Sequence, residues 1–467
     1  MPYVDILAHD DYLSFWYTTN TLNCNVSGFD PAKPTILLIP PLAFDSSWLS
    51  NQFGDPRLNG SYNMIAFDSR FAGRTRSRPN PSIDLWVEAA DLALACQTLQ
   101  LHSVHIWAEE SLAVNVALRF ALLFPDMCLS LALITVGPPT ELPSYHSSFE
   151  ETVRMWSFAE DLDGLEHAAH LFLNLTVGYD LDPEETDNIV SYWQTTYPPF
   201  QRVRLAGAIN LTSNRIPLSS YQLSLITQPV LILHGENNAL HPIKHAQQLS
   251  EDLQNSNVSL SVLKGCAGYL SLIPTCASIL NKIYVKFVSR IPPPESTPLP
   301  VPIPISMKRA LATLAGLVDR PMITMRDPMS PMSFSVVTPE VEKQQREVFI
   351  SFIRGQTAAF SPLGEDGRPL RKFSERKDGH WSNGDHQGMS HAGGPDSATL
   401  KLPSNKSNPP AREKTETMMR PPEPVTLEMV IDSGLRRTGF STYSVDKLSL
   451  RTTLSRTSVI SRLPVKN

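Results

Sequence analysis

The sequence lacks the features that mark secreted, membrane-spanning and metal-binding proteins. No apolar run reaches the roughly 18 residues that a membrane-crossing helix needs. The first ten residues contain no cationic stretch followed by an apolar core, so no secretory signal is expected. The five cysteines are odd in number and scattered, and none lies at the spacing of metal ligands. We therefore expect reduced thiols, a cytoplasmic location, and neither metal nor cofactor.

Clustered positive charge is also missing, and its absence bears on nucleic-acid binding. Residues 1–290 carry a net charge of −12, whereas residues 291–467 carry +6. Because contacts with phosphate need clustered lysine and arginine, the acidic body predicts no nucleic-acid partner. The positive charge of the second region is diffuse, which is typical of a solvated surface.

The chain divides into two regions of different character near residue 290. In residues 1–290, short apolar runs alternate with helical patterns, which predicts an α/β domain with a mostly parallel sheet. Residues 291–467 hold 21 of the 40 prolines and a long polar stretch, which predicts a largely disordered C-terminal tail. Two short helices are expected in this tail, near 307–318 and 339–354. Their apolar faces could dock on the body or bind a protein partner.

The alternation of expected strands and helices in residues 1–290 is interrupted once. Residues 140–222 are rich in helical patterns and aromatic side chains but contain no clear strand. An insertion of this kind between two strands predicts a helical lid, which could cover a pocket for an apolar small molecule. The expected strands are six apolar runs, at residues 34–41, 62–67, 104–107, 129–135, 230–233 and 258–263.

Several fragments, taken in their order and spacing, resemble the α/β-hydrolase superfamily and look nearest to its long-tailed fungal members. The resemblance covers about residues 10–290. It implies an α/β-hydrolase sheet and acyl-transfer chemistry: a serine on a sharp strand-to-helix turn attacks a carbonyl, a histidine takes its proton, and an acid orients the histidine. The fragments are Leu37–Pro41, Ile65–Thr75, Phe120–Pro125, Val230–Glu236 and Gly265–Gly268.

The strand-to-helix turn departs from the pattern of the family. The family reads G-x-S-x-G there, whereas this chain reads Glu109-Glu110-Ser111-Leu112-Ala113. Ser111 fits the helix that follows, and we take it as the candidate nucleophile. If the strand ends at Trp107, however, Ala108 takes the first glycine position and Glu110 takes the nucleophile position. Ser111 could also act only as a helix N-cap.

The acid and base positions depart as well. Asn238 aligns with the acid, and an amide there does not stabilise imidazolium; that change costs about four orders of magnitude in a serine protease. Tyr269 aligns with the histidine, and a phenol with a pKa near ~10 is a poor proton acceptor at neutral pH. His241 is a possible substitute base. The resemblance also implies that the backbone N–H groups of Leu42 and Leu112 form the oxyanion site.

Two functions are therefore compatible with the sequence. In the first, the chain is a non-catalytic α/β-hydrolase-fold protein, or pseudoenzyme, that binds a small molecule or a partner. In the second, it is a weak or unorthodox serine hydrolase that cleaves esters or lactones with Ser111. The loss of both the acid and the base favours the first function, and whether the chain is an enzyme stays open.

Overall fold

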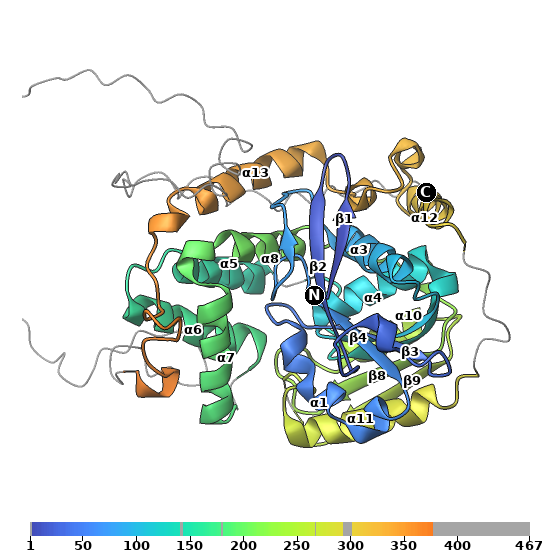
Figure 1. Ribbon diagram of the computed structural model, residues 1–467, viewed down its shortest axis with the longest axis horizontal. Coiled ribbons are helices and arrows are strands. Elements are labelled where there is room, and N and C mark those ends of the chain that lie inside the picture. The colour runs from blue at the N-terminus through green and yellow to red at the C-terminus, as the bar shows by residue number, and fades with distance from the viewer. Residues whose placement is uncertain (1, 141–142, 179–180, 267, 293–300, 377–467) are drawn as a thin grey trace, which may run out of the picture. The chain divides into compact units, whose positions relative to one another are not determined.

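A nine-stranded sheet forms the centre of the computed structural model, which describes residues 2–140, 143–178, 181–266, 268–292 and 301–376 (Figure 1). The strand order is β1-β2-β4-β3-β6-β7-β8-β9, and β5 pairs with β2. The mostly parallel sheet confirms the predicted α/β fold class. The strands are β1 (Tyr3–Leu7), β2 (Tyr12–Thr19), β3 (Thr35–Ile39), β4 (Asn63–Phe67), β5 (Arg76–Ser77), β6 (Val104–Glu109), β7 (Cys128–Ile134), β8 (Val230–Gly235) and β9 (Val258–Leu263).

The six apolar runs of the sequence form the parallel part of this sheet. Strand β3 pairs in parallel with β4 on one side and with β6 on the other, and β7, β8 and β9 continue the parallel order. Strands β1, β2 and β5 are antiparallel and were not predicted. In β1 buried residues alternate with half-buried or exposed ones, and the buried run of β2 includes the polar residue Ser14, so neither strand reads as a continuous apolar run.

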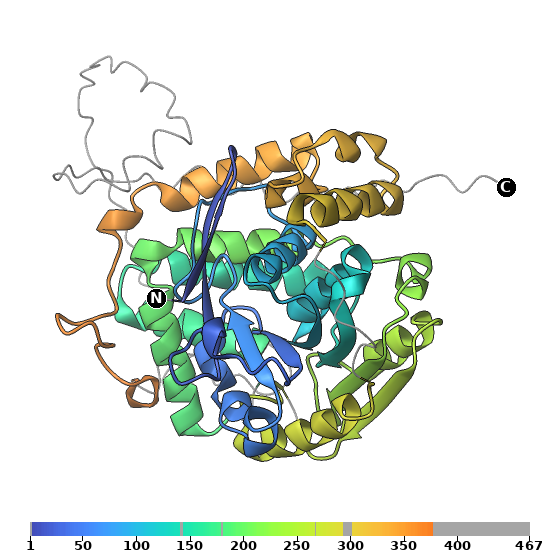
Figure 2. The ribbon, with the colours of Figure 1, turned by 45° about the vertical axis from the view of Figure 1, so that its right-hand side comes forward.

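Helices cover both faces of the sheet because successive side chains of each strand point to opposite faces. Leu37 and Ile39 belong to the hydrophobic core beneath α3 and α4, whereas Ile36 and Leu38 belong to the core beneath α11. Figures 1 and 2 show these helices on the two sides of the strands. The helices are α1 (Ser50–Phe53), α2 (Pro56–Asn59), α3 (Leu85–Thr98), α4 (Ser111–Leu123), α10 (Lys244–Asp252) and α11 (Pro274–Val288).

The chain between β7 and β8 forms helices and has its own hydrophobic core. Trp156, Phe172 and Trp193 are buried in this core, together with Phe44 from the body. The predicted helical insertion is thus present, and we call it the lid. Its helices are α5 (Pro143–Ser157), α6 (Leu162–Thr176), α7 (Pro183–Thr196), α8 (Val203–Ser213) and the short α9 (Ser220–Ser224).

Residues 301–376, which we call the strap, pack on the body and the lid (Figure 2). The strap contains α12 (Ile303–Leu317) and α13 (Pro339–Ile353), near the two positions predicted for helices. The predicted domain boundary near residue 290 stays a prediction. Apolar side chains of the strap nevertheless complete two cores, one in the body and one in the lid. The rest of the predicted tail, 377–467, lies outside the described residues.

Buried side chains and polar contacts hold the strap in place. Leu314 packs against the core of α3 and α4, and Phe349 lies in the core of the lid. Arg371 forms ion pairs with Asp163, at 2.7 Å, and with Glu166 on α6. The strap therefore links the lid to the body through contacts with both.

We expect the strap to contribute measurably to stability. Leu314→Ala should lower the free energy of unfolding by about 2–5 kcal/mol, because it leaves a cavity at a fully buried site. Thr313→Ala on the exposed side of the same helix should change it by no more than about 0.5 kcal/mol. Urea unfolding measures both values. Equal effects of the two substitutions would contradict the packing of α12 on the body.

Candidate functional site

In the turn between β6 and α4, Glu110 has an unusual backbone conformation. This residue has φ 78° and ψ 155°, and α4 begins at the next residue, Ser111. A positive φ is uncommon for a residue other than glycine and costs about 1–3 kcal/mol, so it tends to mark functional sites. Strand β6 continues to Glu109, two residues further than the sequence indicated. The structure thus places Glu110 on the turn, whereas the sequence favoured Ser111 there.

The two N–H groups predicted for the oxyanion site meet at the Glu110 carboxylate. The N–H of Leu112 donates to Glu110 Oε2 at 3.1 Å, and the N–H of Leu42 donates to the same oxygen at 3.5 Å. Glu110 also serves as the N-cap of α4. The structure therefore brings the predicted donors together, but around a carboxyl oxygen that belongs to the chain itself.

The hydroxyl of Ser111 is buried and receives a hydrogen bond from a cation. Arg215 Nη1 donates to Ser111 Oγ at 2.7 Å, and only 1% of Ser111 is exposed. His241 Nδ1 lies nearby, since a Cβ added to Gly137 would be 2.4 Å from Ser111 Oγ and 3.2 Å from His241 Nδ1. That ring nitrogen nevertheless has no hydrogen-bond partner among the described residues. His241, the possible substitute base, therefore makes no hydrogen bond to Ser111 through this nitrogen.

Asn238 and His241 lie on the loop after β8, where they shape the backbone. Asn238 Oδ1 accepts the N–H of His241 at 2.9 Å, and the His241 carbonyl oxygen lies 2.7 Å from His234 Nε2. Burial lowers the pKa of His241 to about 4, and the positive charges of His234, Arg215 and His245 add to this effect. His241 is thus a neutral and weak base at physiological pH.

Tyr269 lies in a closed space rather than in an open pocket. Its ring packs against Phe44, with the ring centroids 5.7 Å apart. The cavity at this site measures about 20 Å³, close to the room for a single water, whereas ligand pockets measure about 300–1,000 Å³. The cavity is lined by Leu42, Glu110, Leu112, Tyr145, Phe149, Thr176, Thr212, His241 and Tyr269.

A second carboxyl group, that of Glu109, is fully buried beneath the loop that carries Tyr269. Glu109 Oε1 accepts the backbone N–H of Ser271 at 2.9 Å. Burial raises the pKa of Glu109 to about 7, although the hydrogen bonds with the loop act in the opposite direction. Glu109, which stands where the family has its first glycine, thus supports the neighbouring loop.

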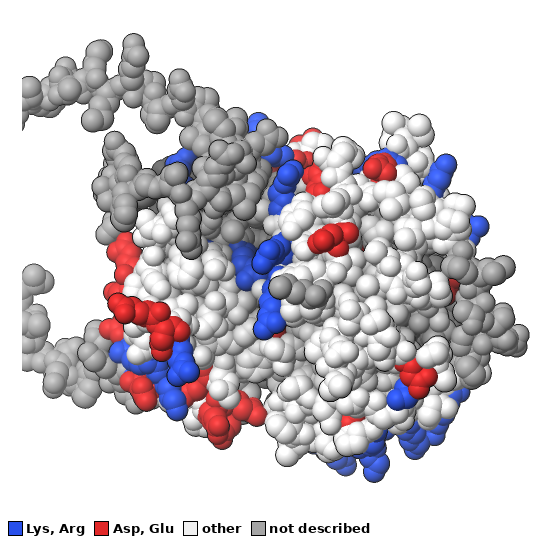
Figure 3. Space-filling model, in the orientation of Figure 1, with Lys and Arg blue, Asp and Glu red and all other residues white. Residues whose placement is uncertain are grey.

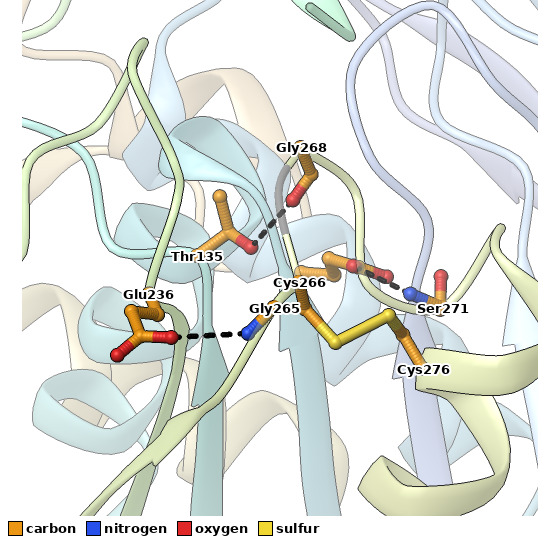
Figure 4. Close-up of a disulfide and its surroundings, with 8 residues drawn as sticks. Thr135, Glu236, Gly265, Cys266, Gly268, Ser271 and Cys276 are labelled. Carbon is orange, nitrogen blue, oxygen red and sulfur yellow. Dashed lines mark hydrogen bonds between the residues drawn. A yellow bond between two sulfur atoms is a disulfide. The ribbon is translucent and has the colours of Figure 1, made fainter. Parts of the chain in front are cut away.

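A disulfide ties the same loop to the start of α11. Cys266 and Cys276 are joined in the structure, and Figure 4 shows the bond beside Gly268 and Ser271. The prediction of reduced thiols is therefore wrong for this pair, since the fold and not the sequence spacing brings them together. The remaining cysteines, Cys24, Cys96 and Cys128, are free.

Arg215 is the residue of this site that the sequence analysis missed. It follows the last turn of α8 in the lid, is 7% exposed and reaches Ser111. A single arginine in a polar segment carries no signal of burial, so only the three-dimensional contact identifies it. Across the described ranges, no three His, Cys, Asp or Glu side chains are grouped as metal ligands would be. In the same ranges no helix is long and apolar enough to cross a membrane.

The buried carboxyl of Glu109 predicts a pH dependence of stability. The folded chain keeps the proton up to a pH of about 7, whereas the unfolded chain releases it near 4.5. The Glu109 contribution to the free energy of unfolding should therefore fall as pH rises from about 4.5 to about 7. In urea unfolding at several pH values, Glu109→Gln should flatten this part of the profile. Identical profiles for the two proteins would contradict a raised pKa at Glu109.

Comparisons with known proteins agree with this geometry. A family model described as alpha/beta hydrolase fold matches residues 34–268, which is half of the chain. The structure is similar to a thermophilic esterase from Thermogutta terrifontis, with 17% identity and a TM-score of 0.50, over 62% of this chain and 99% of that one. It is also similar to a carboxylesterase from the thaumarchaeon Nitrososphaera gargenis, with 15% identity and a TM-score of 0.50, over 62% and 100%. No curated protein gives a significant match. By the family match, the chain belongs to the α/β hydrolase fold family.

Proposed function

We propose that this chain is a non-catalytic member of the α/β hydrolase family that acts as a binding protein. One observation carries the proposal: the N–H groups of Leu42 and Leu112 both donate to the carboxylate of Glu110. An acyl-transfer enzyme holds these donors ready for the charge that develops on the substrate oxygen, and the loss of one donor costs about 10²–10³ in kcat. Here both donors are already occupied by a side chain of the protein.

The position of the Glu110 side chain is also an obstacle to acyl transfer. Its carboxyl group fills the place that the oxygen of a tetrahedral intermediate would take beside the two N–H groups. Proton transfer is also unsupported, since His241 is a weak base and does not contact Ser111. The site thus opposes both the attack and the stabilisation of the intermediate.

The small cavity favours a surface interaction over a preformed small-molecule pocket. A space of about 20 Å³ admits no organic ligand unless side chains such as Glu110 and Tyr269 move. An apolar ligand under the lid remains a prediction from the sequence, as does a partner for residues 377–467. The cytoplasmic location also remains a prediction, and the Cys266–Cys276 disulfide weighs against it because disulfides are rare in the cytosol.

A weak serine hydrolase is the second candidate, and the contact between Arg215 and Ser111 is the observation that favours it. A guanidinium group that donates to a serine oxygen stabilises the alkoxide form of that serine. The structural neighbours named as esterases share the fold, but a fold by itself does not define an activity. This candidate requires a base for Ser111, and His241 Nδ1 makes no hydrogen bond to it.

Labelling with a serine-directed fluorophosphonate distinguishes the two candidates. We expect no labelling of the full chain and no turnover of p-nitrophenyl butyrate, because His241 is a weak base without a hydrogen bond to the serine and Glu110 fills the oxyanion site. An active serine esterase treated in parallel serves as the control for the probe. Labelling that disappears in Ser111→Ala would establish the hydrolase. Turnover that survives in Ser111→Ala but is lost in Glu110→Gln would identify the carboxylate as the nucleophile.

Removal of the Glu110 side chain should open an anion-binding site. Glu110→Gly tolerates the positive φ and frees the two N–H groups, so propionate, which replaces the missing atoms, should bind and raise the melting temperature. The wild-type chain and Glu110→Gln should show no such rise, because their own side chains still occupy the donors. An equal rise in all three proteins would show that propionate binds elsewhere.

A further inference from the structure

The outer face of the antiparallel corner, formed by β1, β2 and β5, gathers arginine and aromatic side chains. Tyr3 lies opposite Trp16 in the register of β1 and β2, and residues opposite each other share a face. In the segment that contains β5, Arg74, Arg76 and Arg78 are exposed, while Thr75 between the first two is buried. The three arginines therefore project from the same side. We call Tyr3, Trp16, Arg74, Arg76 and Arg78 the arginine face.

Aromatic rings hold two of these guanidinium groups in place. Arg74 Cζ lies 4.7 Å from the ring centroid of Trp16, and Arg76 Cζ lies 5.8 Å from that of Tyr3. The two rings contact each other edge to face, at 4.9 Å between centroids. A guanidinium group stacked on a ring keeps its N–H donors at its rim, where a carboxylate can accept two of them at once. The stacking thus orders the donors before any partner arrives.

The arginines of this face form no ion pair within the described part of the chain, although Asp5 lies on the same face. No described carboxylate forms an ion pair with Arg74, Arg76 or Arg78, although buried arginines such as Arg70 are paired. Asp5 on β1 is the nearby acid, and it accepts a hydrogen bond from Ser14. Figure 3 shows a column of Lys and Arg side chains beside the position of β1 and β2 in Figure 1. The face is therefore locally cationic on an acidic body.

We propose that the arginine face binds an extended acidic segment of a partner protein. Residues two apart in an extended chain are about 6.6–6.8 Å apart, so carboxylates at alternate positions of such a segment match Arg74, Arg76 and Arg78. Trp, Tyr and Arg are also the residues that dominate binding energy at protein interfaces. This interaction does not depend on whether Glu110 occupies the oxyanion site. It would persist if the chain proved to be a hydrolase.

The same observations argue against a nucleic acid at this face. Single strands bind by stacking bases on aromatic rings, but the rings of Trp16 and Tyr3 are already covered by guanidinium groups. A long polyanion would also experience the net charge of −12 that residues 1–290 carry, whereas a short acidic segment would meet mainly the local charge. The geometry thus favours a protein segment of limited length.

Fluorescence anisotropy with the full chain tests this proposal. The probe is a labelled nine-residue peptide in which glutamate and threonine alternate, and a lysine–threonine peptide is its control. We expect the glutamate peptide to bind and the lysine peptide not to bind. The triple variant Arg74→Gln, Arg76→Gln and Arg78→Gln should bind the glutamate peptide at least about tenfold more weakly, since it loses three charge-assisted contacts.

A matched variant separates this face from the general charge of the chain. The substitutions Lys282→Gln, Lys286→Gln and Arg309→Gln remove the same charge from exposed positions elsewhere and should leave the affinity unchanged. Equal weakening in both triple variants would overturn the proposal. Tighter binding of a labelled oligo(dT) than of the peptide would overturn it in favour of a nucleic acid. Thermal melts of both variants check that each is folded, which the exposure of all six residues favours.

Discussion

The site depends on one interaction, in which two backbone N–H groups from separate loops converge on a single carboxylate oxygen of Glu110. This contact explains why a residue with a long side chain tolerates a positive φ at the tightest turn of the fold. A hydrogen bond contributes about 0.5–1.5 kcal/mol, so two of them are comparable with the strain. In an enzyme of this family, the same donors would bind the substrate oxygen. In this chain a side chain of the protein occupies them, and the proposed lack of catalysis rests on that contact.

The surrounding structure is consistent with a site that stays closed. Tyr269 and side chains of the lid leave only a small cavity beside the turn that carries Glu110. Glu109 accepts a hydrogen bond from the backbone of the loop that carries Tyr269. The strap in turn connects the lid to the body through Leu314 on one side and Arg371 on the other. An active hydrolase needs a lid that admits substrate. Here the contacts around the Glu110 turn and along the strap act together to keep the lid against the body.

Sequence reasoning recovered the parallel strands because buried strands read as continuous apolar runs, such as residues 35–39. It missed β1 and β2, because β1 is short and the buried run of β2 contains the polar residue Ser14. The sequence analysis preferred Ser111 for the turn, whereas Glu110, its alternative, has the positive φ. Strand β6 also extends through the buried Glu109, which no hydrophobic pattern would include in a strand. The disulfide and the contact of Arg215 with Ser111 join segments distant in sequence or unmarked by any motif, so only the folded chain shows them.

The most direct test of this account is a crystal structure of the full chain at a resolution that defines side chains. We predict that Glu110 Oε2 lies within hydrogen-bond distance of both the Leu42 and the Leu112 backbone nitrogen, with no water or ion between them. A Glu110 carboxylate that points away from the Leu42 and Leu112 N–H groups, with a water or an anion bound there instead, would contradict the account. It would show an oxyanion site that is empty and available to a substrate.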